Sequence, residues 1–160
     1  MATTTRLVAA DADDVFAVLA DGWTYSDWVV GTAHIRAVDD RWPQQGSHLY
    51  HKAGPWPVSL KDRSTVLECA PGRMLLLKVR LWPFGAGQVR LDLTPVSPGR
   101  TRVTMKEQFT QGALLGARNK LHDVLLHYRN REALRRLADI AVNRAAENVP
   151  ATPDRTHDGA

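Results

Sequence analysis

The chain of 160 residues has a single cysteine, Cys69, which excludes an intrachain disulfide and a zinc site built on several thiolates. It also lacks any run approaching the roughly 20 apolar residues that a membrane-spanning helix needs. Residues 1–6 lack the apolar stretch of a signal peptide, and three aspartates follow soon after them. These absences predict a soluble protein, and we expect it in the cytoplasm.

Motifs that carry a known chemistry are missing as well. No serine lies in a GxSxG turn, and the glycines at 85 and 87 precede a predicted strand, whereas a dinucleotide-binding loop precedes a helix. His122 and His127 are five residues apart, which places them on poorly aligned helical faces without a carboxylate at a matching spacing. We therefore expect no metal and no cofactor.

The charge is mildly positive, with a formal net charge of +4 and a pI of about 9.6. This excess is too small to indicate a nucleic-acid partner, and a solvated, arginine-rich surface explains it. Arginines do gather near the C-terminus, so a basic helix that meets an anionic membrane or protein stays open as an alternative. They are Arg129, Arg131, Arg135, Arg136 and Arg144.

What the chain does contain is a series of segments with regular hydrophobic patterns. Residues 3–9 are typical of a strand, and Asp11 is a suitable N-cap for a short amphipathic helix that ends at Gly22. A second helical turn is expected over 24–28. Six further segments alternate apolar and polar residues, which predicts strands at 32–39, 47–52, 58–69, 74–81, 88–94 and 101–109.

Short connections between these strands imply antiparallel neighbours, and one apolar face on each implies a sheet that is covered on one side. The cover is a long helix at 114–146, which carries two displaced apolar stripes. The first stripe is Leu121, Val124, Leu125 and Tyr128; the second is Leu126, Ala133, Leu137, Ile140 and Ala141. We expect the first stripe to face a hollow under a curved sheet, and the second to pack on its rim or on the opening helix.

The composition of residues 149–160 predicts a disordered tail after a single domain at 1–148. Within that domain, the order of elements and several local phrases resemble the helix-grip fold of the SRPBCC superfamily, which includes START-like proteins. The phrases are Trp-Val-Val-Gly-Thr at 28–32, Arg-Trp-Pro at 41–43, Gly-Ser at 46–47, Pro-Gly-Arg at 71–73 and Arg-Asn-Arg-Glu-Ala-Leu at 129–134.

This resemblance covers residues 3–144 and implies an α+β fold. A curved seven-stranded antiparallel sheet would wrap around a long C-terminal helix, with two short helices after the first strand. Within the superfamily, the chain is similar to bacterial members that are grouped with polyketide cyclases, dehydrases and lipid-transport proteins. Members of the superfamily bind apolar ligands, and some cyclise polyketides, but they share no universal catalytic motif.

Strand phase identifies three polar residues that are expected to point into the hollow. Glu107 lies in phase with Met105 and Phe109, Asp62 shares a face with Leu60 and other inward residues, and His51 is in phase with Leu49. Each is a candidate for acid–base catalysis. The structural alternative for an inward acid is a place at the mouth of the pocket, or an ion pair with a nearby arginine.

The same phase, together with the distribution of aromatic residues, predicts the lining of the pocket. The predicted ligand-binding residues are Trp28, Ile35, Leu49, Leu60, Leu77, Val79, Leu91, Met105, Phe109, Leu121, Leu125 and Tyr128, and Trp56 and Trp82 are candidates for its entrance. We favour binding or transport of a hydrophobic small molecule, such as a lipid or a polyketide. The alternative is a polyketide cyclase or dehydratase, which would need polar groups to converge on one point.

Overall fold

The computed structural model describes residues 2–53, 60–81, 85–111 and 120–148. Seven strands and several helices follow one another in the order that the hydrophobic patterns predict. They are β1 (Ala2–Val8), α1 (Ala12–Ala20), the 3₁₀ turn η1 (Gly22–Thr24), α2 (Tyr25–Trp28), β2 (Thr32–Val38), β3 (His48–Ala53), β4 (Leu60–Ala70), β5 (Met74–Leu81), β6 (Gly85–Ser97), β7 (Arg100–Gln111) and α3 (Lys120–Glu147).

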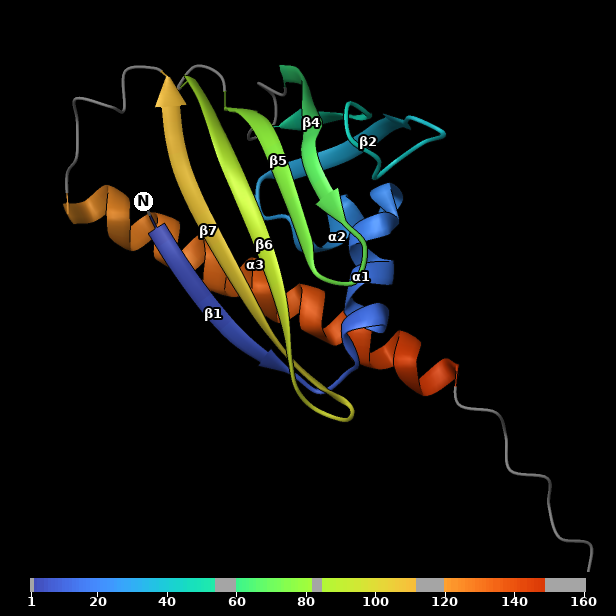
Figure 1. Ribbon diagram of the computed structural model, residues 1–160. Coiled ribbons are helices and arrows are strands. Elements are labelled where there is room, and N and C mark those ends of the chain that lie inside the picture. Colours follow the sequence, from blue (N-terminus) through green and yellow to red (C-terminus); the bar gives the residue numbers. More distant parts are fainter. Residues whose placement is uncertain (1, 54–59, 82–84, 112–119, 149–160) are drawn as a thin grey trace, which may run out of the picture.

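The strands form one antiparallel sheet in the order β1-β7-β6-β5-β4-β3-β2. From β2 to β7, each strand pairs with the one that follows it in sequence. Strand β1 pairs with β7 and so forms the edge opposite β2. Figure 1 shows the sheet curving around α3, with α1 and α2 beside its C-terminal half. The prediction of a helix-grip α+β fold is confirmed.

One end of the concave face is packed solid. Leu75, Leu91 and Val103, from three neighbouring strands, are each 0% exposed. They belong to a core that includes the buried face of α1 and, from α3, Leu134 and Leu137. Because α1 and α3 both cover this part of the sheet, its aliphatic side chains are removed from water on every side. We call this region the packed end.

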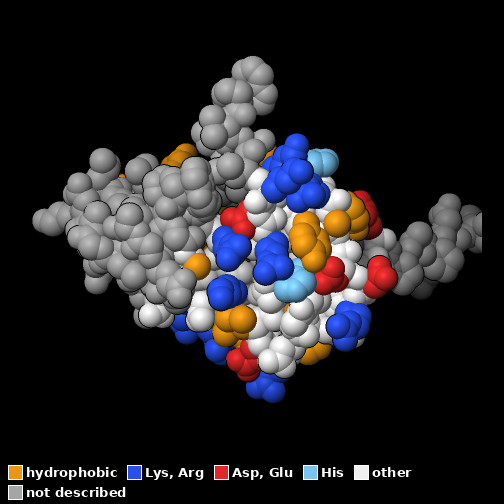
Figure 2. Space-filling view, turned by 90° about the horizontal axis from the view of Figure 1, so that it is seen from above, with side chains coloured by type: hydrophobic (Ala, Val, Ile, Leu, Met, Phe, Trp, Pro, Cys, Tyr) orange, Lys and Arg blue, Asp and Glu red, His pale blue; other side chains and the backbone are white. Residues whose placement is uncertain are grey.

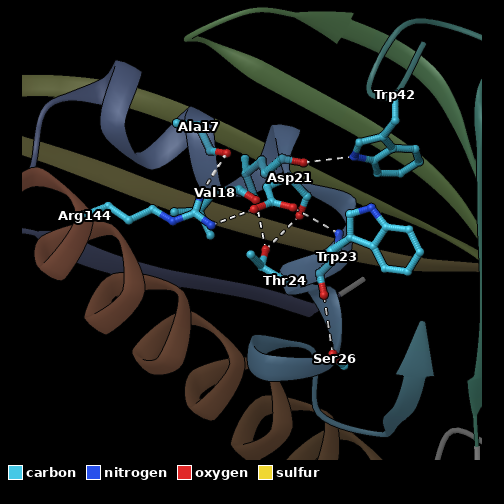
Figure 3. A network of polar contacts seen from close by, with 9 residues as sticks. Ala17, Val18, Asp21, Trp23, Thr24, Ser26, Trp42 and Arg144 are labelled. Atoms are coloured by element: carbon cyan, nitrogen blue, oxygen red, sulfur yellow. Dashed lines mark hydrogen bonds and ion pairs between the residues drawn. The ribbon is translucent and has the colours of Figure 1, made fainter. Parts of the chain in front are cut away.

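A polar clasp joins the C-terminal half of α3 to α1 at the packed end (Figure 3). The Arg144 guanidinium donates to the Asp21 carboxylate at 2.6 Å, just after the last residue of α1. The hydroxyl of Thr24 in turn donates to the carbonyl oxygens of Val18 and Asp21. The turn after α1 is thus tied both to its own helix and to α3, which holds α3 across the sheet.

Strand β2 departs from the predicted alternation. The pattern places Ala33, Ile35 and Ala37 on one inward face, but only Ile35 is buried, and both alanines are exposed. Register shifts interrupt the pairing of β2 with β3 on either side of Ile35. Each irregularity changes which side chains face the sheet interior, so the period-two pattern does not carry through.

The helix α3 also has a different inward face from the one predicted. Tyr128 and Val124, from the first apolar stripe, are 72% and 64% exposed, whereas Leu126, Ala133 and Leu137 of the second stripe are buried. The prediction that Tyr128 lines the interior is therefore wrong. The inward face was obscured because one of its positions holds a polar residue, Asn130, which is 2% exposed.

Smaller differences concern the ends of elements. Asp11 occupies the N-cap position of α1 but makes no side-chain cap; its carboxylate accepts instead from the backbone N–H of Gly99, at 2.7 Å. Strand β6 begins at Gly85, inside the break that the sequence predicts over 82–87. The predicted tail at 149–160 lies outside the described residues.

Candidate functional site

At the end of the concave face opposite α1, the inward aliphatic side chains are less completely covered. Val79 on β5 and Val89 on β6 are only partly buried, although both point to the same side as the buried Leu77. Directly opposite residues in antiparallel strands share a face, so the pairing of Val89 with Glu107 places that acid on the same side. We call this region the open end.

Strands β3 and β4 bring a buried histidine to the open end. His51 is 7% exposed, and its Nε2 lies 3.2 Å from the hydroxyl oxygen of Ser64, which is also buried. The other ring nitrogen, Nδ1, is buried and has no hydrogen-bond partner among residues 2–53, 60–81, 85–111 and 120–148. Burial lowers the pKa of His51 below its ordinary value of 6.5, and the nearby Asp62 carboxylate opposes that shift. The ring is therefore neutral at physiological pH.

Asp62 lies directly across from His51 in the β3–β4 pairing, which puts both side chains on the concave side. Asp62 is half-buried, and its Oδ1 accepts a hydrogen bond from the backbone N–H of Arg63 at 2.7 Å. His51, Asp62 and Ser64 thus form one polar group, which we call the histidine cluster. It offers a neutral imidazole, a hydroxyl and a carboxylate.

A second polar group forms where β7 meets α3. Glu107 is 2% exposed; its Oε1 accepts from the guanidinium of Arg129, and its Oε2 accepts from the Asn130 side-chain amide at 2.9 Å. A buried carboxylate is tolerated when both oxygens have charged or polar donors, as here. This group, which we call the glutamate cluster, matches the ion-pair alternative that the sequence left open for Glu107.

The two clusters do not converge. The histidine cluster is on β3 and β4, the glutamate cluster is on β7, and β5 and β6 lie between them. Adjacent strands are about 4.8 Å apart, so β4 and β7 are separated by roughly 14 Å along the sheet. The inward residues between them are apolar, among them Leu77, Val79 and Val89. The open end is therefore an apolar surface with a polar group at either side.

The other predicted lining residues are divided between the two ends. Leu49, Leu91 and Met105 are buried in the core, and Ile35 is buried opposite His51. Trp28 on α2 is buried against Tyr25, with ring centroids 4.7 Å apart, and its Nε1 finds no hydrogen-bond partner in the part of the chain that the structure describes. The remaining predictions fall on side chains outside the described part: Leu60, Phe109, Leu121, Leu125, Trp56 and Trp82.

Arg129, Asn130 and Ser64 were not identified as site residues from the sequence. The first two lie in the phrase at 129–134 that carried the resemblance, and Arg129 is also one of the arginines of the basic-helix alternative. Their partner Glu107 lies 22 and 23 residues away in the chain. Ser64 shares a strand face with Asp62. A serine on an inward face does not by itself indicate a site, and its contact with His51 on the neighbouring strand cannot be seen in the sequence.

Most arginines of α3 are held in ion pairs. Arg135 and Arg136 pair with Glu132, Arg135 also pairs with Asp139, and Arg144 pairs with Asp21. On the face of the molecule shown in Figure 2, Lys and Arg side chains are interspersed with hydrophobic, histidine and acidic ones. No helix in the described part of the chain combines the length and apolar character that crossing a bilayer requires.

Comparison with known proteins agrees with this architecture. Residues 2–142 match the model of the family "Polyketide cyclase / dehydrase and lipid transport". The chain therefore belongs to this family, which confirms the resemblance inferred from the sequence. No curated protein matches it.

Solved structures share the fold at low sequence identity. A protein of Nitrosomonas europaea superposes with a TM-score of 0.70 at 20% identity, over 90% of this chain and 95% of its own. The Zhui aromatase/cyclase of Streptomyces sp. R1128 gives 0.63 at 19% identity, over 93% and 94%. A START superfamily protein of Mycobacterium smegmatis gives 0.63 at 16%, over 91% and 96%.

Proposed function

We propose that the protein binds a hydrophobic small molecule, of lipid or polyketide type, on the concave face of its sheet at the open end. The observation that carries this proposal is the buried Nδ1 of His51, which has no hydrogen-bond partner among the described residues and lies on the same side of the sheet as the partly buried Val79 and Val89. Buried polar atoms are nearly always paired, so one without a partner marks a place where a ligand can supply it.

The chemistry of the open end defines the kind of ligand. Val79 and Val89 offer apolar surface, and the histidine cluster at one side offers a hydrogen bond to a hydroxyl or carbonyl group. A ligand pocket is generally built in this way, with a mostly apolar lining and a few placed polar groups. A largely apolar molecule with one oxygen near His51 fits this pattern.

The proposal is tested by filling the open end from within. Val89→Trp should weaken binding of the neutral fluorescent probe N-phenyl-1-naphthylamine about tenfold or more, because the indole occupies the space that an apolar ligand needs. Val96→Trp is the matched control, since Val96 is exposed on the same strand. Equal binding by both variants, measured by fluorescence titration with circular dichroism as a check of folding, would refute the proposal. Native mass spectrometry of freshly purified protein then identifies any molecule that is carried along.

A cyclase or dehydratase activity is the second candidate, and the neutral His51 favours it. In the tautomer that donates from Nε2 to Ser64, Nδ1 has a free lone pair and can accept a proton from the carbon between two carbonyl groups. Glu107 is less suited to this role, because both of its oxygens already accept hydrogen bonds.

The two candidates are separated by replacing His51. With a poly-β-ketone thioester as substrate, His51→Gln should lower the rate of cyclisation by about 100-fold or more if the imidazole is the base. Probe binding should survive in the same variant. If no cyclised product forms with the unmodified protein, or if His51→Gln and Glu107→Gln both leave the rate unchanged, the enzyme hypothesis fails and the binding hypothesis remains.

A further inference from the structure

A pocket lies apart from the open end of the concave face, between the edge strand β1 and α3. Its volume is about 480 Å³, within the usual range for a small-molecule site. It is lined by Thr3, Thr4, Thr5, Arg6, Leu7, His127, Arg131 and Leu134. None of these residues belongs to the histidine cluster or the glutamate cluster.

The local structure explains why a groove forms there. Strand β1 is at the edge of the sheet, paired with β7 on one side only in the described part of the chain. Five consecutive residues of β1 line the pocket, so both faces of the strand and its free backbone edge border it. On α3, the residues at 127, 131 and 134 follow the helical repeat, which puts them in one stripe facing β1.

The pocket is cationic. Arg6 and Arg131 line it together with His127, and none of the eight described residues that line it is Asp or Glu. Within the described residues, neither arginine has a carboxylate in ion-pair range, in contrast to Arg129, Arg135, Arg136 and Arg144 of the same helix. Among the residues that the structure describes, no ion pair therefore neutralises the two arginines of this groove.

Two buried polar atoms of the groove lack hydrogen-bond partners within the described part of the chain. They are the hydroxyl oxygen of Thr4, a residue that is 5% exposed, and the buried Nε of Arg6. The pairing of Thr4 with Met105 and of Arg6 with Val103 turns both side chains toward α3. Leaving such groups unpaired costs free energy, which a bound acceptor would recover.

We propose that this groove binds the carboxylate or phosphate group of a small-molecule anion. A guanidinium presents several N–H donors in a fixed fork that matches both groups, and the Thr4 hydroxyl adds one donor. Leu7 and Leu134 offer apolar contact to the rest of the molecule. The site is separate from the proposed concave site, so one can be occupied or abolished without the other.

The test uses two anions, inorganic phosphate and butyrate, each titrated against sodium chloride of equal ionic strength. Amide resonances of the pocket residues on β1 and α3 should shift saturably with phosphate, butyrate or both, and the tighter of the two identifies the group. Arg6→Gln and Arg131→Gln should each raise the dissociation constant about tenfold or more, because each removes charge-assisted hydrogen bonds. Arg36→Gln, on exposed β2 at the opposite sheet edge, is the charge-matched control and should change it less than twofold.

Thr4→Val keeps the test decisive if an arginine variant folds poorly. This variant removes the unpaired hydroxyl, so it should unfold at an equal or higher urea concentration while it binds the better anion several-fold more weakly. Shifts that do not saturate, or that chloride reproduces, overturn the proposal. It is equally overturned if the pocket variants bind no more weakly than Arg36→Gln.

Discussion

The two ends of the concave face are built from the same strands and the same alternation, yet they differ in composition and packing. At the packed end, Leu75, Leu91 and Val103 are sealed by α1 and α3. At the open end, Val79 and Val89 are partly exposed, and His51, Ser64 and Glu107 are buried polar residues. One end is therefore a closed apolar core, while the other combines partly buried apolar side chains with buried polar groups. The difference lies in what covers the sheet.

The largest effect on the free energy of unfolding is expected from Glu107→Gln, at the open end. The substitution keeps the shape of the side chain but leaves the partly buried Arg129 without its carboxylate, so unfolding should become easier by about 3 kcal/mol. Urea denaturation measures the loss. Glu132→Gln is the control, because Glu132 also pairs with arginines but lies on the solvent side of α3, and its loss should be much smaller. Equal losses would mean that burial does not distinguish the two ion pairs.

A matched pair of valines compares the two ends directly. Val103→Ala removes methyl groups from a fully buried position, and about 2 kcal/mol of stability should be lost. Val89→Ala, at a partly exposed position on the next strand, should cost less than about 1 kcal/mol. Binding of the apolar probe should fall only in the second variant. If probe binding falls in Val103→Ala and not in Val89→Ala, the ligand-binding surface lies at the packed end instead.

The pH dependence of stability gives a smaller effect. The pKa of His51 is lower in the folded protein than its ordinary value of 6.5, so the unfolded chain binds more protons between those two values. The contribution of the neutral His51 ring to the free energy of unfolding is complete above pH 6.5. It is lost as the pH falls toward the pKa of His51 in the folded protein. His51→Gln should therefore flatten the decline in stability below pH 6.5, measured by urea denaturation at several pH values. His34→Gln, at an exposed position on β2, should keep the decline.

The smallest effect is expected at Tyr128. Because its side chain is 72% exposed, Tyr128→Ser should change stability by no more than about 0.5 kcal/mol and leave probe binding unchanged. Leu126→Ala, two residues earlier on the buried face, should cost about 2 kcal/mol or more. A loss of probe binding in Tyr128→Ser would mean that Tyr128 faces the bound probe, as the sequence analysis predicted.

Much of the fold followed from local patterns. The period of two in β5 and β7 predicted their inward faces, and phase alone placed Glu107 beside Met105. The same reasoning failed where a tertiary contact reversed a local preference. Asn130 occupies an inward position of α3 because Glu107 accepts its hydrogen bond, and a polar residue there divides the apolar stripe. In β2, the register shifts next to Ile35 turned two alanines outward.

The amino-acid sequence by itself determined the class of fold, because side-chain periodicity and short connections are local and leave a direct trace in the chain. The family membership followed from the same elements. Only the tertiary structure decided that Glu107 pairs with Arg129 and Asn130, and that Arg6 and Arg131 line one groove with no acid among its described lining residues. Those outcomes depend on how α3 crosses the sheet, which brings together residues that are far apart in the chain and carries no periodic signal.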